Sequence, residues 1–533
     1  MTASRVSVQR LGRIGDDALT GVLLVGVLAA GLAVFMAREG ALAGTRGFPL
    51  DDSWIHLRFA RNLAEGAGFS YNPGVPVSGS TAPLWTVLLA GAFWLGADGL
   101  ASAKAVGVAL AAGVVLATWR LATAWTRSRG LGLLAGVLVA GSGPLLWGAL
   151  SGMEVVLAAL LTTAGLLAHT QNRAWAAGAL TGLACLARPE AGLLLPLIWL
   201  AGPVTARRTL AVAAPTVATL APWVAFNLWT TGQPFPATAA AKVEGGLLAA
   251  LSGIREPVRE ALLGRPLAFA GEWATWLWSV NALLPLLVLP GLAALWVRAG
   301  RSLALPASVL LVHPLAMALL AAYRGPGFQE GRYSIHLLPL AFAVAVTALT
   351  PPGPVAAAGR GARPLRRGLA LGLIAAGALA IGPAASRYGW AVQNIDAMQV
   401  HLGHWVHDRT PPAARLALND VGAIAYLSRR EVVDLMGLVS PAIIAARRQG
   451  EAGILEFLDG ACPDYLVIFP DWFPALATRT DYFTPIHRVR LAHNTVAGSD
   501  EMVVYETVWN RWRAAPRPCG DPRTTSRDAT RKH

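Results

Sequence analysis

Two adjacent carboxylates, Asp51 and Asp52, stand at the start of a segment with helical periodicity between Ser53 and Glu65. Apolar residues recur on one face of this segment, and arginines, among them Arg58, lie on the other. A carboxylate at the start of a helix can be an N-cap, stabilised by the positive end of the helix dipole. It can also be a general base beside a partner carboxylate. An acid pair followed by arginines on an interfacial helix would suit a lipid phosphate beside an acceptor hydroxyl.

Polar residues also interrupt later apolar runs, and each interruption holds groups that could bind an anion or orient a hydroxyl. The candidates are Glu154, the pair Arg188 and Glu190, Lys242, and Arg332 with Tyr333. Arginine and lysine can bind phosphate, whereas a carboxylate can orient an acceptor or assist a base. Each residue can also be structural, as a helix cap or as a cation whose stem lies in apolar surroundings while its charge reaches the membrane surface.

The composition around these residues is that of a membrane protein. Of the 533 residues, 55% are hydrophobic and 14% are charged, and the mean hydropathy is +0.50. Soluble domains carry roughly 25% charged residues, and one soluble core could not bury so much apolar surface. The net charge of +14 lies in short clusters between apolar runs. No groove-reading motif accompanies it, so we expect a lipid bilayer and no nucleic acid as partner.

Apolar runs predict about eleven membrane-spanning helices. They lie at roughly 18–36, 103–124, 131–148, 154–169, 174–187, 190–202, 209–227, 274–297, 302–322, 333–350 and 369–386. With a cytoplasmic N-terminus, every cytoplasmic loop receives arginines, which is the positive-inside pattern. These are Arg127 and Arg129, Arg173, Arg207 and Arg208, Arg298 and Arg301, and Arg360, Arg363, Arg366 and Arg367. The candidate site residues and the C-terminal domain then lie on the extracytoplasmic face of a cell membrane, plasma or inner.

Two segments bear on this count. The stretch from Pro83 to Gly96 is apolar but short. If it spanned, every later loop would change sides, so we interpret it as interfacial or re-entrant. The runs at 174–187 and 190–202 are split by Arg188-Pro189-Glu190, which suggests a bent hairpin.

After about Arg387 the composition changes to that of a soluble protein. We therefore expect a transmembrane domain at 1–386, a soluble domain at 387–513 and a disordered tail at 514–533. Strands predicted at 415–420, 431–435 and 465–469, with helices at 421–427 and 441–449, favour a small α/β domain. Cys462 and Cys519 could form a disulfide in an oxidising compartment, although Cys519 lies near the tail. No Cys/His spacing of a zinc site is present.

Six motifs, in order, carry a resemblance to a known superfamily. The stretch DDSWIHLRFARNLAEGAGFSYNPGVPVSGSTAPLW resembles the first external loop of bacterial GT-C glycosyltransferases. It looks closest to the terminal arabinofuranosyltransferase-like branch, and more distantly similar to protein O-mannosyltransferases and aminoarabinose transferases. The later matches are 151–154, 186–190, 232–242, 331–333, and 419–426 together with 434–441. Two positions depart from the pattern, since Ala237 stands where Asn is usual and Phe59 replaces the usual Tyr.

The resemblance implies a GT-C-like fold, a polyprenyl-phosphate-linked sugar donor and inverting transfer. Asp51 matches the catalytic base, which would deprotonate an acceptor hydroxyl for attack on the anomeric carbon, and Asp52 matches its acidic neighbour. The leaving phosphate and the remaining substrate would be bound by Arg58, Arg188, Glu190, Lys242, Arg332 and Tyr333. Glu154 would orient the acceptor or assist the base. No cofactor and no metal is expected, because the leaving group carries one phosphate and has basic partners.

Several alternatives stay open at this point. Adjacent residues on a helix point about 100° apart, so either Asp51 or Asp52 could be the base. The donor sugar, the linkage, the oligomeric state and the class of acceptor, whether glycan, lipid or protein, are not fixed. A transporter or flippase of lipid-linked sugars would also need many helices and buried charges, although no inverted repeat is visible. A non-catalytic scaffold would not depend on Asp51.

Overall fold

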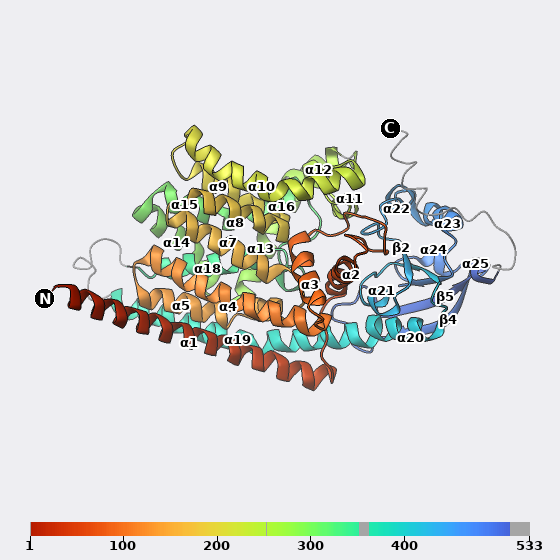
Figure 1. Cartoon of the computed structure of the whole chain (residues 1–533), viewed down its shortest axis with the longest axis horizontal. Coiled ribbons are helices and arrows are strands. Elements are labelled where there is room, and N and C mark those ends of the chain that lie inside the picture. The colour runs from red at the N-terminus through yellow and green to blue at the C-terminus, as the bar shows by residue number, and fades with distance from the viewer. Residues whose placement is uncertain (1, 252, 351–361, 512–533) are drawn as a thin grey trace.

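The computed structural model describes residues 2–251, 253–350 and 362–511. Its long axis runs from a bundle of helices to a smaller α/β domain (Figure 1). Helices α2 (Asp52–Ala64), α3 (Pro83–Trp94) and α11 (Ala237–Lys242) lie between the bundle and the domain. Short connecting elements complete this region: α12 (Gly246–Leu251), the π-helical turn η2 (Glu260–Gly264) and α17 (Phe328–Gly331).

Long apolar helices form the body of the bundle. Within the described residues, four helices are long and apolar enough to cross a membrane, or up to seven if each bent pair is one span. The four are α1 (Thr2–Ala43), α4 (Gly99–Thr126), α10 (Ala206–Thr231) and the helix that begins with α19 (Ala362–Ile395). The bent pairs are α5 (Arg129–Ala140) with α6 (Gly143–Leu150), α13 (Arg265–Val280) with α14 (Leu284–Ala299), and α15 (Arg301–Ala307) with α16 (Val309–Leu320). These are the lengths and compositions of an integral membrane protein.

Shorter apolar helices fill the remaining predicted runs. They are α7 (Val155–Thr170), α8 (Ala174–Ala187), the 3₁₀ helix η1 (Pro189–Leu193) with α9 (Leu194–Leu200), and the 3₁₀ helix η3 (Ile335–Leu337) with α18 (Leu338–Thr347). The break expected at Arg188-Pro189-Glu190 is present, because α8 ends at Ala187 and η1 begins at Pro189. Proline has no amide hydrogen and cannot continue the preceding helix without loss of a hydrogen bond.

The loops that carry arginines lie together at one end of the bundle. Three contacts connect them: Arg129 with Asp16 at 3.4 Å, Arg298 Nη1 with the Thr126 carbonyl at 3.4 Å, and Arg301 Nη2 with the Gly202 carbonyl at 3.4 Å. The candidate site residues and the α/β domain lie at the other end. The arginine-bearing loops and the candidate site residues thus lie at opposite ends of the described bundle; Arg360 lies outside the described residues.

Helix α3 enters and leaves at the end of the bundle that carries the α/β domain. Near its start, Trp85 Nε1 donates to the Gly152 carbonyl at 2.9 Å. Just after its end, a Cβ on Gly99 would lie 3.0 Å from the Tyr426 hydroxyl and 3.3 Å from Leu57. Both ends of α3 thus meet the same region, as in an interfacial or re-entrant segment.

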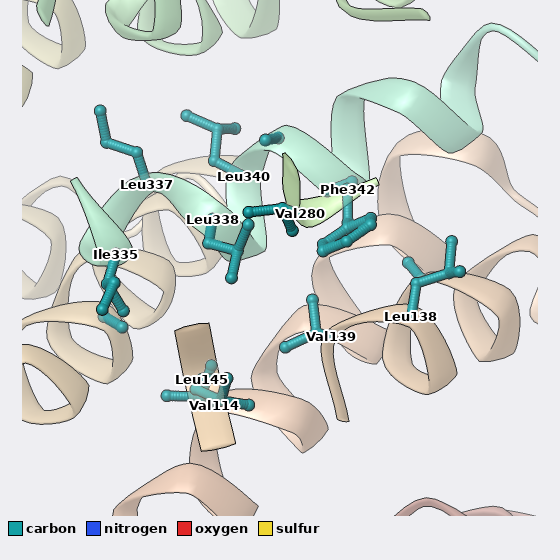
Figure 2. Close-up of a cluster of buried hydrophobic side chains, with 14 of the residues drawn as sticks. Val114, Leu138, Val139, Leu145, Val280, Ile335, Leu337, Leu338, Leu340 and Phe342 are labelled. Atoms are coloured by element: carbon teal, nitrogen blue, oxygen red, sulfur yellow. The ribbon is translucent and has the colours of Figure 1, made fainter. Parts of the chain in front are cut away.

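The bundle packs around α18. Every residue of α18 from Leu338 to Thr347 is buried, and a helix that is apolar all round belongs in the centre of a bundle. Figure 2 shows Leu338 and Phe342 of α18 close to Val139 of α5 and Val280 of α13, with Val114 and Leu145 nearby.

The α/β domain continues from the last long helix without a break. Helix α19 passes through the π-helical turn η5 (Asp396–Val400) into α20 (His401–Arg409), so one helix runs through the predicted boundary at 386 and 387. The predicted strands are present as β1 (Arg415–Leu418), β2 (Glu431–Asp434) and β3 (Tyr465–Ile468). The predicted helices are present as α21 (Ala423–Ser428) and α22 (Ile443–Arg447). Further elements are α23 (Gly450–Ala461), α24 (Pro474–Ala477), β4 (Phe483–Arg490), β5 (Glu501–Thr507) and α25 (Val508–Arg511).

The five strands form one sheet in the order β2-β1-β3-β5-β4. Strand β1 is parallel to both β2 and β3, whereas β5 is antiparallel to β3 and β4. Cys519 and the predicted tail lie outside the described residues, so the pairing of Cys462 with Cys519 stays a prediction.

Candidate active site

The two carboxylates at the start of α2 point to different neighbours. Asp51 is only 9% exposed, and its carboxylate accepts hydrogen bonds from the backbone amides of Gly422 at 2.6 Å and Ala423 at 2.7 Å. Burial raises the pKa of the Asp51 carboxyl well above its ordinary value, Asp420 adds to this effect, and the two amides oppose it. A side chain at Gly422 would collide with Asp51, so glycine is needed for this close approach. Asp51 therefore faces the α/β domain.

Asp52 lies between two cations. Its side chain is 30% exposed, with Arg332 Nη1 at 3.1 Å from Oδ2 and Lys242 Nζ at 3.9 Å from Oδ1. Burial would raise the pKa of Asp52, but Arg332 and Lys242 hold it well below its ordinary value. Arg332 Nη2 also donates to the Tyr333 hydroxyl at 3.2 Å.

A second buried network surrounds Glu154. Arg188 Nη1 donates to Glu154 Oε1 at 2.6 Å, and His56 Nε2 lies 3.1 Å from Oε2. Burial would raise the pKa of Glu154, but His56 and Arg188 lower it to about 2. Arg188 also pairs with Glu190 at 3.2 Å and lies 4.7 Å over the Tyr333 ring. The guanidinium of Arg188 is thus fixed by two carboxylates and one aromatic ring.

Tight turns present these side chains. Three consecutive residues before Arg332 have positive φ: Gln329 at 48°, Glu330 at 60° and Gly331 at 76°. A Cβ at Gly331 would collide with the Trp276 ring. The left-handed region costs a residue with a side chain roughly 1–2 kcal/mol, and such strain persists where the surrounding structure enforces it. Gly152, with φ of 73°, forms the corresponding turn before Glu154.

A cavity of about 980 Å³ lies between the bundle and the α/β domain. Asp51 lines it, Asp420 lines it on the domain side, and Asp52, Lys242 and Arg332 line it on the bundle side. A smaller pocket of about 40 Å³ adjoins the same three residues. Its other charged and aromatic lining residues are His56, Glu154, Arg188 and Tyr333. Glu190 lines neither the cavity nor the pocket, but it pairs with Arg188, which lines the pocket.

Three of the four cations expected at a phosphate site therefore converge, and Arg58 does not. Arg58 is 2% exposed and donates to the backbone carbonyls of Tyr71 and Arg430, each at 2.8 Å, and to that of Ala425. Its guanidinium joins α2 to the α/β domain and lines neither the cavity nor the pocket. The assignment of Arg58 to the phosphate site does not hold, because the polar face of α2 packs against protein there.

Three residues of the site were not singled out as site residues from the sequence. Asp420 and Asn419 follow β1, and Gln399 lies in η5; all three line the cavity. Asn419 and Asp420 belong to the last of the six motifs, and this motif could have identified them as site residues from the sequence. Among the described residues, no group of three or more His, Cys, Asp or Glu side chains could hold a metal ion.

Comparisons with known proteins agree with this architecture. Residues 393–517 match a family described as "Domain of unknown function (DUF8728)". A search of curated proteins found no match.

Solved structures align over most of the chain. ArnT from Cupriavidus metallidurans bound to undecaprenyl phosphate aligns with a TM-score of 0.57 and 13% identity, over 91% of this chain and 97% of ArnT. The Archaeoglobus fulgidus oligosaccharyltransferase aligns with a TM-score of 0.55 and 12% identity, over 90% of this chain and 74% of that chain. The arabinofuranosyltransferase AftD from Mycobacteria aligns with a TM-score of 0.42 and 19% identity, over 90% and 41%. The first two alignments establish that this membrane protein, with its C-terminal α/β domain, has the GT-C fold.

Proposed function

We propose that this protein transfers a glycosyl residue from a polyprenyl-phosphate-linked sugar to an acceptor on the extracytoplasmic face of the membrane. The observation that carries the proposal is Asp52, a carboxylate held by Arg332 and Lys242 on the bundle side of the cavity. The shared fold supports it, since ArnT has been solved with undecaprenyl phosphate and the archaeal oligosaccharyltransferase AglB with a dolichol-phosphate and an inhibitory peptide.

In this proposal, Asp52 is the general base and Asp51 is a positioning residue. The resemblance alone favoured Asp51, and both carboxylates line the cavity. The two oxygens of Asp51, however, accept from the Gly422 and Ala423 amides, whereas Asp52 is more exposed and lies beside the two cations. Asp52 takes the proton of the acceptor hydroxyl, and the hydroxyl oxygen forms a bond to the anomeric carbon. The bond from that carbon to the phosphate oxygen breaks, and polyprenyl phosphate leaves with the electron pair. One displacement of this kind inverts the anomeric configuration.

Donor binding would also prepare the base. With Arg332 and Lys242 both paired to it, Asp52 is a weak proton acceptor, because nearby cations favour the ionised carboxylate. The donor phosphate competes for the same two cations, which raises the proton affinity of Asp52 only when donor is present. The cations in turn stabilise the charge that develops on the leaving phosphate.

The second network would hold the site in shape. Arg188 is already paired with Glu154 and Glu190, so it contributes less to the phosphate than Arg332 or Lys242. Its contact with the Tyr333 ring, and that of His56 with Glu154, keep the pocket wall in place. Glu154 is thereby an orienting residue.

We also propose the membrane arrangement predicted from the arginines. The seven long or bent helices, with the shorter apolar helices Val155–Thr170, Ala174–Ala187, Pro189–Leu200 and Ile335–Thr347, would make eleven crossings. Pro83–Trp94 is left out because both its ends meet the same region. The N-terminus is then cytoplasmic, and the α/β domain is extracytoplasmic.

The test is release of undecaprenyl phosphate from undecaprenyl-phosphate-linked pentoses and hexoses by the full chain in lipid nanodiscs, with glycan, lipid and peptide acceptors offered in turn. Asp52→Asn keeps the shape but removes the base, so turnover should fall by roughly 100-fold or more while donor binding persists. Asp51→Asn should reduce turnover less and should lower thermal stability, because one backbone amide loses its charged partner. The exposed Asp408→Asn is the matched control.

Two outcomes would count against the proposal. Full release activity in both Asp51→Asn and Asp52→Asn would refute an acid–base role for the pair. Movement of intact lipid-linked sugar across a vesicle membrane, without release of undecaprenyl phosphate, would indicate a flippase instead.

A further inference from the structure

The α/β domain turns the carboxyl ends of its parallel strands toward the cavity. Strand β1 leads into Asn419 and Asp420, β2 leads toward Met436, and the loop after β3 carries Trp472. All four residues line the cavity. In open α/β sheets, ligands bind at this edge.

The strand order places a topological switch point at the same edge, where successive connections run in opposite directions along the sheet. From β1 the chain passes through α21 to β2, and from β2 it returns through α22 and α23 to β3 on the other side of β1. The order β2-β1-β3 is that of doubly wound folds whose ligands lie between β1 and β3. The loops after these two strands are joined here, because the Phe469 amide donates to Asn419 Oδ1 at 3.1 Å.

Two buried amides on this wall have atoms without a partner. Gln399 is 0% exposed and Asn419 is 3% exposed. Gln399 Nε2 donates to Asp420 Oδ2 at 2.8 Å, but Gln399 Oε1 and Asn419 Nδ2 have no hydrogen-bond partner among the described residues. An unpaired buried polar atom costs roughly 1–3 kcal/mol. A hydroxyl group suits both atoms, because it can donate to the glutamine oxygen and accept from the asparagine nitrogen.

An aromatic ring completes the wall. Trp472 is 43% exposed, and its Nε1 donates to the Gly498 carbonyl at 3.0 Å, which holds the ring in place. A tryptophan face can cover the C–H groups of a ring whose hydroxyls bond elsewhere. Arg447, which also lines this wall, donates to the Met436 carbonyl at 3.0 Å, so the wall carries one cation as well as the Asp420 carboxylate. The wall thus offers amides, one carboxylate and one aromatic face, with no excess of charge.

We infer that the carboxyl edge of this sheet is the acceptor site, and that the acceptor is an uncharged carbohydrate chain. The inference rests on the proposed function, because an acceptor chain bound at this edge must extend one hydroxyl to within hydrogen-bond reach of Asp52. The cavity of about 980 Å³ is at the top of the ~300–1,000 Å³ range of small-molecule sites. It therefore has room for an acceptor beside the donor headgroup.

The test measures two affinities of the full chain in lipid nanodiscs, one for undecaprenyl phosphate and one for a set of uncharged pentose and hexose oligosaccharides. Trp472→Ala should weaken oligosaccharide binding about fivefold to tenfold. Trp472→Phe should retain most of the binding, because it keeps an aromatic face. Gln399→Ala should weaken binding too, whereas the exposed Gln449→Ala on the same domain is the matched control. All four variants should bind undecaprenyl phosphate as the wild type does. Lys242→Ala should instead weaken undecaprenyl phosphate binding and leave oligosaccharide binding unchanged.

The outcomes separate the two proposals. If the wild type binds undecaprenyl phosphate but none of the oligosaccharides, or if neither Trp472→Ala nor Gln399→Ala changes their binding, the acceptor site is refuted and the proposed function stands. If undecaprenyl phosphate does not bind the wild type, or if Lys242→Ala leaves its binding unchanged, the proposed donor site fails. Loss of undecaprenyl phosphate binding in Gln399→Ala would mark that variant as misfolded, and Trp472→Ala then decides the inference.

Discussion

At the scale of residues, Asp51 and Asp52 are consecutive but take part in different contacts. Side chains of neighbouring helix residues diverge by about 100°. Both line the cavity, but Asp51 accepts from two amides at the start of α21, while Asp52 pairs with Arg332 and Lys242. The α/β domain therefore helps to fix the orientation of the proposed base. A shift of that domain would move Asp52 relative to both cations.

Asp420 predicts how transfer depends on pH. Burial raises the pKa of Asp420 to about 6, Asp52 and Asp434 add to this effect, and the hydrogen bond from Gln399 opposes it. Above that pH Asp420 is an ionised acceptor for hydroxyl groups, and below it the carboxyl is protonated and loses part of that capacity. We expect kcat/KM for the acceptor to fall about tenfold from pH 7 to pH 5. In the donor-free site Asp52 adds no acidic limb in this range, because Arg332 and Lys242 hold its pKa well below its ordinary value.

Two variants check the assignment of this acidic limb. Asp420→Asn should lower kcat/KM at pH 7 and make it nearly independent of pH down to 5. Burial also raises the pKa of Asp434 to about 6, but Asp434 accepts from the amides of Met436 and Val439 and does not line the cavity. A limb that persists in Asp420→Asn and disappears in Asp434→Asn would assign the titration to the loop instead.

Most of the site residues chosen from the sequence line the cavity or its pocket, and the two exceptions are Arg58 and Glu190. Asp52, Glu154, Arg188, Lys242, Arg332 and Tyr333 were all chosen from the sequence, and all border the cavity or its pocket. Arg58 was also chosen, because it lies on the polar face of α2. Periodicity identifies a polar face but not what covers it. Here the α/β domain covers it, more than 350 residues away in the chain, as the bonds to Ala425 and Arg430 indicate.

At the scale of elements, the turn before Arg332 predicts a backbone effect on donor binding. Gly331 has φ of 76° and lies against Trp276, so Gly331→Ala should displace Arg332. Loss of one hydrogen bond to a charged group costs about 1.5–3 kcal/mol. We therefore expect undecaprenyl phosphate to bind roughly tenfold more weakly or worse in this variant.

Gly74→Ala is the control for this prediction. Gly74 has φ of 77°, but no atom lies within 4 Å of the Cβ that alanine would add. It incurs the conformational penalty without the collision, so its affinity for undecaprenyl phosphate should equal that of the wild type. Equal affinity in Gly331→Ala would mean that the turn does not position Arg332.

Element prediction found the three parallel strands but missed both strands of the antiparallel pair, β4 and β5, although most of β5 is buried. Buried strands β1 and β3 were visible as short apolar runs, and proline marked the break between α8 and η1. Strand β4 was missed because most of its residues after Phe483 are exposed or only partly buried, so it lacks a buried stripe. It forms by antiparallel pairing with β5. The predicted boundary at 387 marks the change from an apolar to a soluble-type composition, whereas the helix itself continues to Arg409.

At the scale of the whole molecule, α19 joins the bundle to the α/β domain. Figure 1 shows it beside α1 along the length of the protein. Buried Glu39 of α1 ties the two together, since it accepts from Lys104 Nζ of α4 at 2.6 Å and from the Tyr388 hydroxyl of α19 at 3.4 Å. Three helices are thereby fixed near the end of the bundle where the α/β domain begins. This arrangement suits a domain that must keep a constant distance from the base.

The separation of basic loops from site loops predicts the topology. Arginine-rich loops remain on the cytoplasmic side of membranes, and here they gather at the end of the bundle opposite the α/β domain. A cysteine at Ser128, in the loop between α4 and α5, should react only with a reagent that reaches the cytoplasm. A cysteine at Thr480, on the α/β domain, should react with an impermeant reagent added outside intact cells. Each signal is measured above that of the parent chain, which carries three cysteines of its own. Labelling of both positions from one side would contradict an odd number of crossings between Ser128 and Thr480. It would also contradict the proposed extracytoplasmic location of the site.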